Sequence, residues 1–324
     1  MKPPSDSRAL RAYTRFVAGS TFVLLLAGGV VTSTGSGLAV PDWPLSFGQW
    51  MPPMEGGVLY EHGHRMIAAF VGSLIVVEAL WLWRAEPRRW VRSLGWMALA
   101  GVVVQGLLGG LTVLLRLPTA VSVSHAGLAD LVFGLTVAIA VVTSRSWLEV
   151  DEVERPVDGG TPALATIAAG TAALVWLQIV LGAVVRHTGS GLVIPDFPLA
   201  YGELVPPLAS RAVQLHFAHR VGGVIVAIAA GWVAWRTWRA HRGSSPLVRP
   251  AALLALLVIV QIGLGGWTVL SHKDPLVTTA HVGTGALIFA TVVVLALRSR
   301  RHLALSPAPA HPPITPRVDL AGAR

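Results

Sequence analysis

Apolar residues gather into eight long runs along the chain, and short polar segments separate these runs. The runs lie at about residues 16–33, 65–83, 93–115, 122–143, 163–185, 217–235, 251–270 and 279–297. A helix needs about 20 apolar residues to cross the roughly 30 Å hydrocarbon core of a bilayer. The pattern therefore predicts an all-α polytopic membrane protein with eight transmembrane helices.

The composition agrees with a membrane protein. Of the 324 residues, 53% are apolar and 13% are charged, and the mean hydropathy is +0.64. In soluble domains about a quarter of the residues are charged, and disordered chains contain few apolar residues. Both classes of protein are therefore excluded. The chain has no cysteine, which also excludes disulfides, thiolate metal sites and covalent heme attachment through cysteine.

The net charge of +9 is explained by topology. Of the 25 lysines and arginines, 19 lie in the two tails and in the three loops that follow even-numbered runs. Basic residues concentrate on the cytoplasmic side of membrane proteins. We therefore expect a multi-pass protein with both termini in the cytoplasm, and the basicity gives no reason to expect a nucleic-acid partner.

The chain repeats itself. The segment 27–48 returns as 181–202, and both copies contain Thr-Gly-Ser-Gly-Leu followed by Pro-Asp-aromatic-Pro-Leu. His64-Arg65 returns as His219-Arg220, and 105–114 returns as 261–270, at offsets between 154 and 156 residues. Four spans per copy give both copies the same orientation, which places a pseudo-two-fold axis along the membrane normal.

The repeat predicts two tandem four-helix bundles, 1–150 and 151–302. An acidic linker at 149–158 joins them on the predicted cytoplasmic side. The last segment, 303–324, contains five prolines and no apolar run, so we expect it to be disordered.

Four of the eleven histidines occupy matching positions near the outer ends of even-numbered helices. They are His64 and His125 in the first half and His219 and His281 in the second. Polar groups inside a membrane bundle are costly and usually functional. Two histidines that face each other from neighbouring helices can supply both axial ligands of a heme iron. The neighbouring Arg65 and Arg220 are candidates for pairing with heme propionates.

The two halves differ at one position beside these histidines. Glu61 stands three residues before His64, whereas the equivalent residue before His219 is His216. A carboxylate beside a porphyrin edge can transfer protons or stabilise a cation. The difference suggests one cofactor site and one reaction site. The alternative, a solvated residue at the start of a helix, stays open for Glu61 at this point.

Glu61 and His64 also have the spacing of half a di-iron carboxylate motif. A di-iron site needs a second such pair and further carboxylates inside the bundle, which the sequence does not supply. The other histidines, among them His62, His187 and His241, are expected at the surface. The Pro-Asp-aromatic-Pro loops at 41–44 and 195–198 are expected to cover the histidine-bearing ends.

Together these residues resemble the heme A synthase family over nearly the whole chain. The resemblance is carried by the two four-span halves, by Glu61 to Arg65, by the Gly-Ser-Gly-Leu loop and by the partner histidines. It implies that the C8 methyl group of heme O is oxidised to the formyl group of heme A by successive hydroxylations. It also implies a bacterial cytoplasmic membrane protein with heme sites toward the outer face.

The resemblance implies a role for each site residue. Heme b, the cofactor, would be bound by His219 and His281, and the substrate heme O by His64 and His125, with Glu61 as the catalytic carboxylate. Besides membrane lipid, the expected partners are heme O synthase and a quinone or another electron acceptor. Some family members have a cysteine pair in the first outer loop, where this chain has Val40 and Ser46.

Two other functions compete with this prediction. A di-heme b-type cytochrome passing electrons from quinol would explain the histidines but not the difference between Glu61 and His216. A transporter built from parallel repeats would need broken helices and charged groups at mid-membrane. Glu78 and Asp130 are the acidic residues within the runs, and neither is duplicated.

Overall fold

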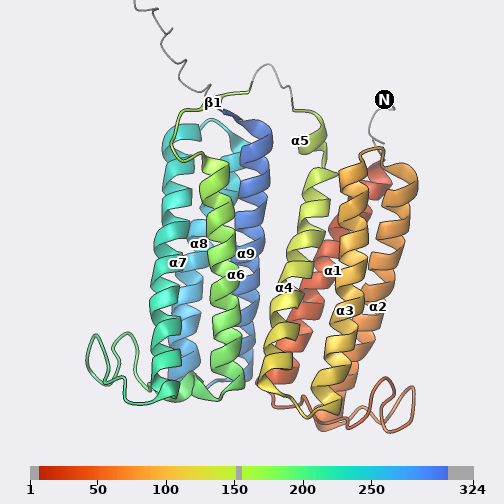
Figure 1. Cartoon of the computed structure of the whole chain (residues 1–324), viewed down its shortest axis with the longest axis vertical. Coiled ribbons are helices and arrows are strands. Elements are labelled where there is room, and N and C mark those ends of the chain that lie inside the picture. Colours follow the sequence, from red (N-terminus) through yellow and green to blue (C-terminus); the bar gives the residue numbers. More distant parts are fainter. Residues whose placement is uncertain (1–6, 151–154, 306–324) are drawn as a thin grey trace, which may run out of the picture.

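The computed structural model describes residues 7–150 and 155–305, and eight long helices dominate it (Figure 1). They are α1 (Arg8–Ser33), α2 (Gly56–Ala85), α3 (Arg89–Leu114), α4 (Thr119–Val142), α6 (Leu164–His187), α7 (Arg211–His241), α8 (Ser245–Leu270) and α9 (Pro275–His302). By length and composition each could cross a membrane, which confirms the predicted all-α membrane protein. Every span is one continuous helix, so the broken helices expected of a transporter are not found among the described residues.

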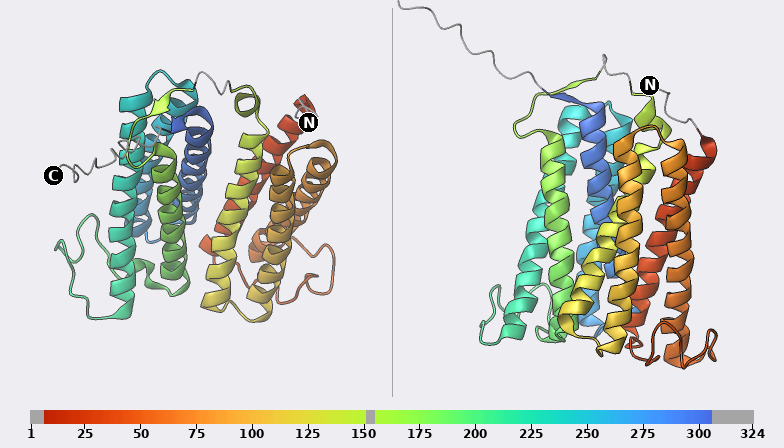
Figure 2. Two further views of the ribbon diagram at one scale, coloured as in Figure 1. Left: turned by 45° about the horizontal axis from the view of Figure 1, so that its top comes forward. Right: turned by 45° about the vertical axis from the view of Figure 1, so that its right-hand side comes forward.

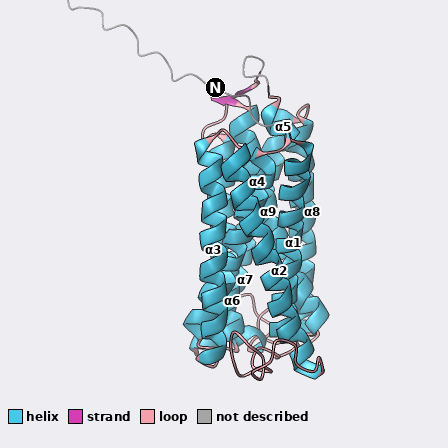
Figure 3. Ribbon diagram, turned by 90° about the vertical axis from the view of Figure 1, so that its right-hand side faces the viewer, coloured by secondary structure: helices cyan, strands magenta, loops and turns pink. Residues whose placement is uncertain are grey.

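Four short elements complete the described chain. They are α5 (Arg145–Leu148), β1 (Val157–Asp158), the 3-10 turn η1 (Ser190–Leu192) and β2 (Ala304–Leu305). Figure 3 shows the strands in magenta at the same end as α5. The two strands pair in parallel, and the Ala304 amide donates to the Pro156 carbonyl at 3.0 Å. The predicted disordered tail was therefore placed too early at residue 303, and the rest of it, 306–324, lies outside the described residues.

The helices form two four-helix bundles, α1–α4 and α6–α9, that lie side by side (Figures 1 and 2). In each bundle every helix packs on its sequence neighbours, and the first also packs on the fourth. Between the bundles α1 packs on α9, α4 on α6, and α4 on α9. Exchanging α1 with α6 and α4 with α9 maps these contacts onto themselves, as a two-fold relation requires.

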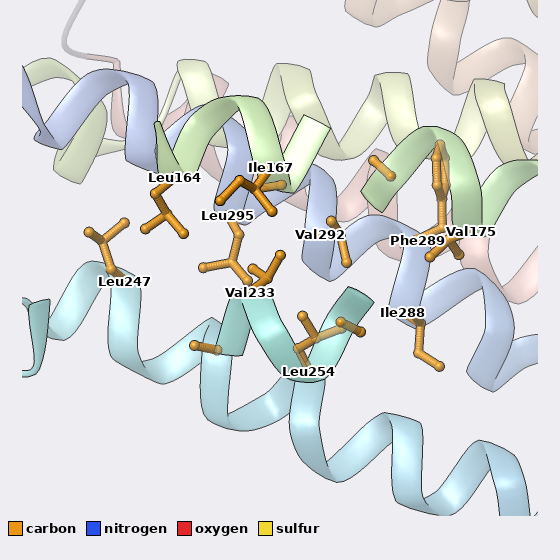
Figure 4. Close-up of a cluster of buried hydrophobic side chains, with 14 of the residues drawn as sticks. Leu164, Ile167, Val175, Val233, Leu247, Leu254, Ile288, Phe289, Val292 and Leu295 are labelled. Carbon is orange, nitrogen blue, oxygen red and sulfur yellow. The ribbon is translucent and has the colours of Figure 1, made fainter. Parts of the chain in front are cut away.

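Each bundle has its own apolar core. Figure 4 shows the second one, in which Leu164, Val233, Leu254 and Leu295 come from four different helices. Between the bundles, small residues allow close approach. A Cβ on Gly134 of α4 would come within 2.6 Å of the Phe289 ring on α9. The bundles are therefore fitted closely to each other.

The two ends of the bundles differ in what they contain. At one end, called here the histidine end, α2, α4, α7 and α9 begin and the long loops 34–55 and 188–210 lie. The other, called the linker end, holds α5, β1 and β2 (Figure 1). The helices extend beyond the apolar runs, since α2 begins at Gly56 rather than near 65. Residues at its predicted start therefore lie well inside a helix.

Asp158 fixes the linker to the second bundle. Its buried carboxylate accepts from the Leu164 amide at 2.5 Å and from the Arg236 guanidinium at 3.1 Å. His241 is also buried and lies 3.8 Å from the same carboxylate. The prediction that His241 is a surface residue was wrong, because α7 is long enough to carry it into this ion-pair cluster.

Candidate functional site

The four matching histidines lie at equal depths in the two bundles. His64 and His219 are the ninth residues of α2 and α7, and His125 and His281 are the seventh residues of α4 and α9. Within each half the two rings are near enough for a charge on one to act on the other. The structure thus brings each predicted pair together at the histidine end.

Each of these imidazole rings packs against a glycine of the neighbouring helix. A Cβ would come within 3.1 Å of His64 at Gly28, 3.3 Å of His125 at Gly109, 2.9 Å of His219 at Gly182 and 3.1 Å of His281 at Gly265. The missing side chain makes room for the ring. The sequence analysis did not predict this role for the glycines, although their recurrence in the repeated motifs could have indicated it.

Glutamine side chains hold three of the four histidines. Gln105 donates to the His125 carbonyl at 2.8 Å, and Gln261 lies 3.5 Å from Nε2 of His281. Gln178 lies 3.0 Å from Nδ1 of His219 and donates to its carbonyl at 2.7 Å.

The first-half counterpart of Gln178 is Leu24. His64 therefore has no equivalent glutamine. The histidine pair of the second half therefore has more glutamine contacts than that of the first half.

Glu61 is buried beside the first pair and is not a solvated residue at a helix start. Its side chain is 5% exposed. One carboxylate oxygen accepts from the Val40 amide at 2.9 Å, and the other forms an ion pair with Arg65 at 2.6 Å. The carboxylate is thus fixed between α2 and the loop after α1, one helical turn from His64.

Arg65 and Arg220 anchor the two long loops. Arg65 donates to the carbonyls of Asp42, Leu45 and Val40 at 2.8, 3.0 and 3.4 Å. Arg220 makes the same three contacts in the second half, with Asp196, Leu199 and Ile194. Most of their N–H groups are used by the loops, and pairing with propionates stays a prediction.

Asp42 and Asp196 close a tight turn in each loop. Asp42 accepts from the amides of Gly48 and Phe47 at 2.8 and 2.6 Å, and Asp196 does the same with Gly202 and Tyr201. These amide hydrogen bonds, with that from Gly48 the largest cause for Asp42 and that from Gly202 for Asp196, hold the pKa of both carboxyl groups below its ordinary value. Their role is to shape the loops.

The aromatic residues of the same loops reach across the bundles. A Cβ on Gly110 of α3 would lie 2.7 Å from the Trp43 ring, and one on Gly266 of α8 would lie 2.6 Å from Phe197. Each glycine directly follows the one that faces His125 or His281. The loops therefore lie against the helices that flank the histidines, as expected of covers.

His62 is a further difference between the halves. It is 7% exposed, and its Nδ1 lies 2.8 Å from the Ser46 hydroxyl. The prediction of a surface loop was wrong because α2 begins six residues before it. The second half has Phe217 and Ala200 at these two positions, so only the first half has this polar pair.

Arg186 is a buried cation that the sequence analysis did not single out. It donates to the Gly29 carbonyl at 3.2 Å and to the Ser33 hydroxyl at 2.7 Å, both on α1 of the other half. No acidic partner is seen among the described residues. Arg186 lies on α6 one turn beyond Gly182, toward the histidine end, and its charge acts on His281.

The residues present fit a heme in each half. Paired imidazoles within an apolar bundle are the donor set of a b-type heme. The Nδ1 atoms of His64, His125 and His281 are buried without a hydrogen-bond partner in the described chain. In the same residues, no three histidine, cysteine, aspartate or glutamate side chains form a group that could hold a metal ion.

Comparisons with known proteins found a matching family and several similar proteins. The cytochrome oxidase assembly protein family COX15-CtaA matches residues 55–294. A heme A synthase of Symbiobacterium thermophilum is 33% identical over 285 residues, covering 85% of this chain and 90% of the relative. Heme A synthases of Shouchella clausii and Halalkalibacterium halodurans are 29% and 26% identical and cover 87% and 92% of this chain, with 94% and 99% of the relatives matched.

Proposed function

The chain belongs to the COX15-CtaA family of cytochrome oxidase assembly proteins, and from this membership we propose how it works as a heme A synthase. It is a multi-pass membrane oxidoreductase that binds heme and converts heme O to heme A. Our proposal concerns which half holds which heme, and what the surrounding side chains do.

The second half holds the resident cofactor, heme b, through His219 and His281. The contacts of Gln178 with His219 support this assignment, because outer contacts that orient a ligand strengthen metal binding. Arg186 supports it as well. A buried arginine without an acidic partner is suited to a carboxylate ligand, and a heme supplies two propionates. When bound, heme b supplies one-electron redox chemistry.

The first half holds the substrate, heme O, through His64 and His125. A substrate must leave after each turnover, and a less firmly held ligand pair suits exchange. Leu24 in place of Gln178 supports this division. Arg65 and Arg220 remain candidates for contact with propionates through the N–H groups that the loops leave free.

Glu61 is the residue that we assign to the chemistry, and its position is the observation that carries the proposal. Conversion of a methyl group and one water to a formyl group releases four protons and four electrons. A fixed carboxylate one turn from His64 can accept protons from the reacting carbon or stabilise positive charge that develops on it. Arg65 and the Val40 amide keep it in place. The second half has His216 there and lacks this acid.

The orientation in the membrane, the electron acceptor and the supply of heme O follow from other features of the chain and of the reaction. The excess of basic residues at the linker end supports a cytoplasmic location for both termini, with the histidine end on the outer side of a bacterial cytoplasmic membrane. The four electrons need an acceptor, and a membrane quinone is our candidate. Heme O is apolar, so direct transfer from heme O synthase is our candidate for its supply.

The proposal is tested in a bacterial host that makes heme O but no heme A. Hemes are extracted and separated by chromatography from cells with and without the gene. New heme A, or a hydroxylated heme O, is the expected result. Folded protein that carries heme b and leaves heme O unchanged would contradict it and favour the di-heme cytochrome.

A further inference from the structure

A groove with three arginines opens between the two bundles at the linker end, far from the four matching histidines. Its volume is about 460 Å³, within the range of small-molecule sites. Arg15 of α1, Arg145 of α5 and Arg298 of α9 line it together. Arg15 lies 13 residues before Gly28 on α1, which is about 20 Å of helix. The groove is thus separate from the heme sites.

The guanidinium group of Arg298 is incompletely satisfied. It donates from Nη1 to the Pro246 carbonyl at 2.9 Å, but its Nε atom is buried without a partner among the described residues. A buried donor without an acceptor is costly, because it has lost its hydrogen bonds to water and gained none in return. An oxyanion in the groove would supply acceptors to this arginine.

The other polar groups of the groove fit the same ligand. Arg15 is exposed and forms no hydrogen bond or ion pair within the described chain. Arg145 pairs with Glu149 at 2.7 Å, on the exposed side. The Ser144 hydroxyl lines the groove as well, and it donates to the Val141 carbonyl at 2.6 Å. A phosphate group suits this set of donors.

The groove changes from polar to apolar along its length. Ser144 and Arg145 stand at its polar end, while Val137 lies two turns deeper on α4 and Ala18 lines α1. Val137 lies five residues before the end of α4 at Val142, which is about 7.5 Å of helix, and Ser144 follows two residues later. A free phosphate ion would use only the polar end. A phospholipid would place its phosphate among the arginines and the first part of its acyl chains along the apolar wall.

The charges are not a consequence of the repeat. The second-half counterpart of Arg15 is Ala169, and the first-half counterpart of Arg298 is Val142. The symmetry-related place between the bundles therefore lacks these two arginines. We propose that the groove lined by Arg15, Arg145 and Arg298 binds one anionic phospholipid through its phosphate group.

The test uses the full chain reconstituted in nanodiscs of phosphatidylglycerol or phosphatidylcholine, with lipid retained after extraction counted by native mass spectrometry. Wild-type protein should retain phosphatidylglycerol in preference to phosphatidylcholine. Each Lys or Arg near a membrane surface attracts anionic lipid enough to change binding about fivefold. Arg298→Gln and Arg15→Gln should each reduce the preference by about that factor, and the double variant should abolish it.

Three controls make the result decisive. Arg298→Lys keeps the charge and should retain most of the preference. Arg242→Gln removes an exposed arginine at the same end, outside the groove, and should behave as wild type. Heme content and helical circular dichroism report folding.

Unchanged lipid preference in the double variant would overturn the proposal, as would an equal loss in Arg242→Gln. Displacement of the retained lipid by inorganic phosphate would show that the groove binds free phosphate instead. None of these outcomes depends on conversion of heme O.

Discussion

Glu61 and His216 occupy the same place in the two halves and make the same contact with different chemistry. Glu61 accepts a hydrogen bond from the Val40 amide at 2.9 Å, and His216 accepts one from the Ile194 amide at 3.3 Å. Each also faces the arginine one turn further on. Loop anchoring is therefore common to both halves, and a carboxylate is not needed for it. What Glu61 adds is an acid beside one histidine pair.

Replacing Glu61 by glutamine should stop heme O conversion while heme b stays bound. The amide keeps an acceptor for the Val40 amide but cannot take up a proton, and loss of such a group typically costs 10²–10⁴-fold in rate. The measurement is heme chromatography from the heme O host, together with the absorption spectrum of the purified protein.

His216→Gln is the matched control, since it places the same residue at the equivalent position of the other half. It should convert heme O at close to the wild-type rate. If Glu61→Gln loses heme b but keeps converting the heme O that remains, the assignment of the two halves is wrong.

Exchanging the residues at positions 178 and 24 should shift heme retention between the halves. Gln178→Leu removes the contacts with His219. Hydrogen bonds to a metal-binding histidine from such neighbouring groups are typically worth about 10–100-fold in metal affinity. We expect heme b to be lost on washing and its midpoint potential to change.

Leu24→Gln is the reciprocal variant. It should slow the release of heme from the first half. Equal heme b retention and an unchanged potential in Gln178→Leu would show that this glutamine only packs the helices.

Individual residues show which features of the structure can be predicted from the sequence and which cannot. The apolar runs predict the eight helices, and the repeat predicts the four matching histidines, because duplicated positions in matching helices lie at the same depth. It does not predict that His62 is buried, because the apolar run starts after it while α2 starts before it. Arg65 suggested a propionate contact, but its loop carbonyl partners become evident only once the loop folds back on α2. The sequence also does not predict that Arg186 is a candidate, because its contacts are with α1 of the other half.

The turn around Asp42 should open in acid. Amide hydrogen bonds, first of all from Gly48, hold the pKa of this carboxyl group below its ordinary value, near 3.9 in unfolded chains. A lowered pKa in the folded state means that the stabilisation is present above the ordinary value and is lost as the pH falls through the folded one. The protection factor of the peptide containing Phe47 and Gly48, which is its intrinsic exchange rate divided by the observed rate, should therefore be high at neutral pH and fall only below about pH 4.

Asp42→Ala should show fast exchange of this peptide already at neutral pH. Glu55→Ala removes an exposed carboxylate from the same loop that makes no cap hydrogen bond, and it should leave the exchange unchanged. Slow exchange in Asp42→Ala would mean that Arg65 alone holds the loop.

Adding one methyl group at Gly182 should disturb the resident heme more than adding one elsewhere on α6. In Gly182→Ala the new Cβ would lie 2.9 Å from Cε1 of His219, so the ring must move away from its present orientation, at a typical cost of about 1–3 kcal/mol. We expect roughly tenfold weaker heme b retention and a changed absorption spectrum.

Gly170→Ala, on the same helix, has no atom within 4 Å of the new Cβ and should keep wild-type heme content, with a small gain in helix stability. Because both variants make the same substitution in one helix, a difference between them isolates the contact with His219. Full heme b content and an unchanged spectrum in Gly182→Ala would remove the glycine-histidine contact from the account of the site.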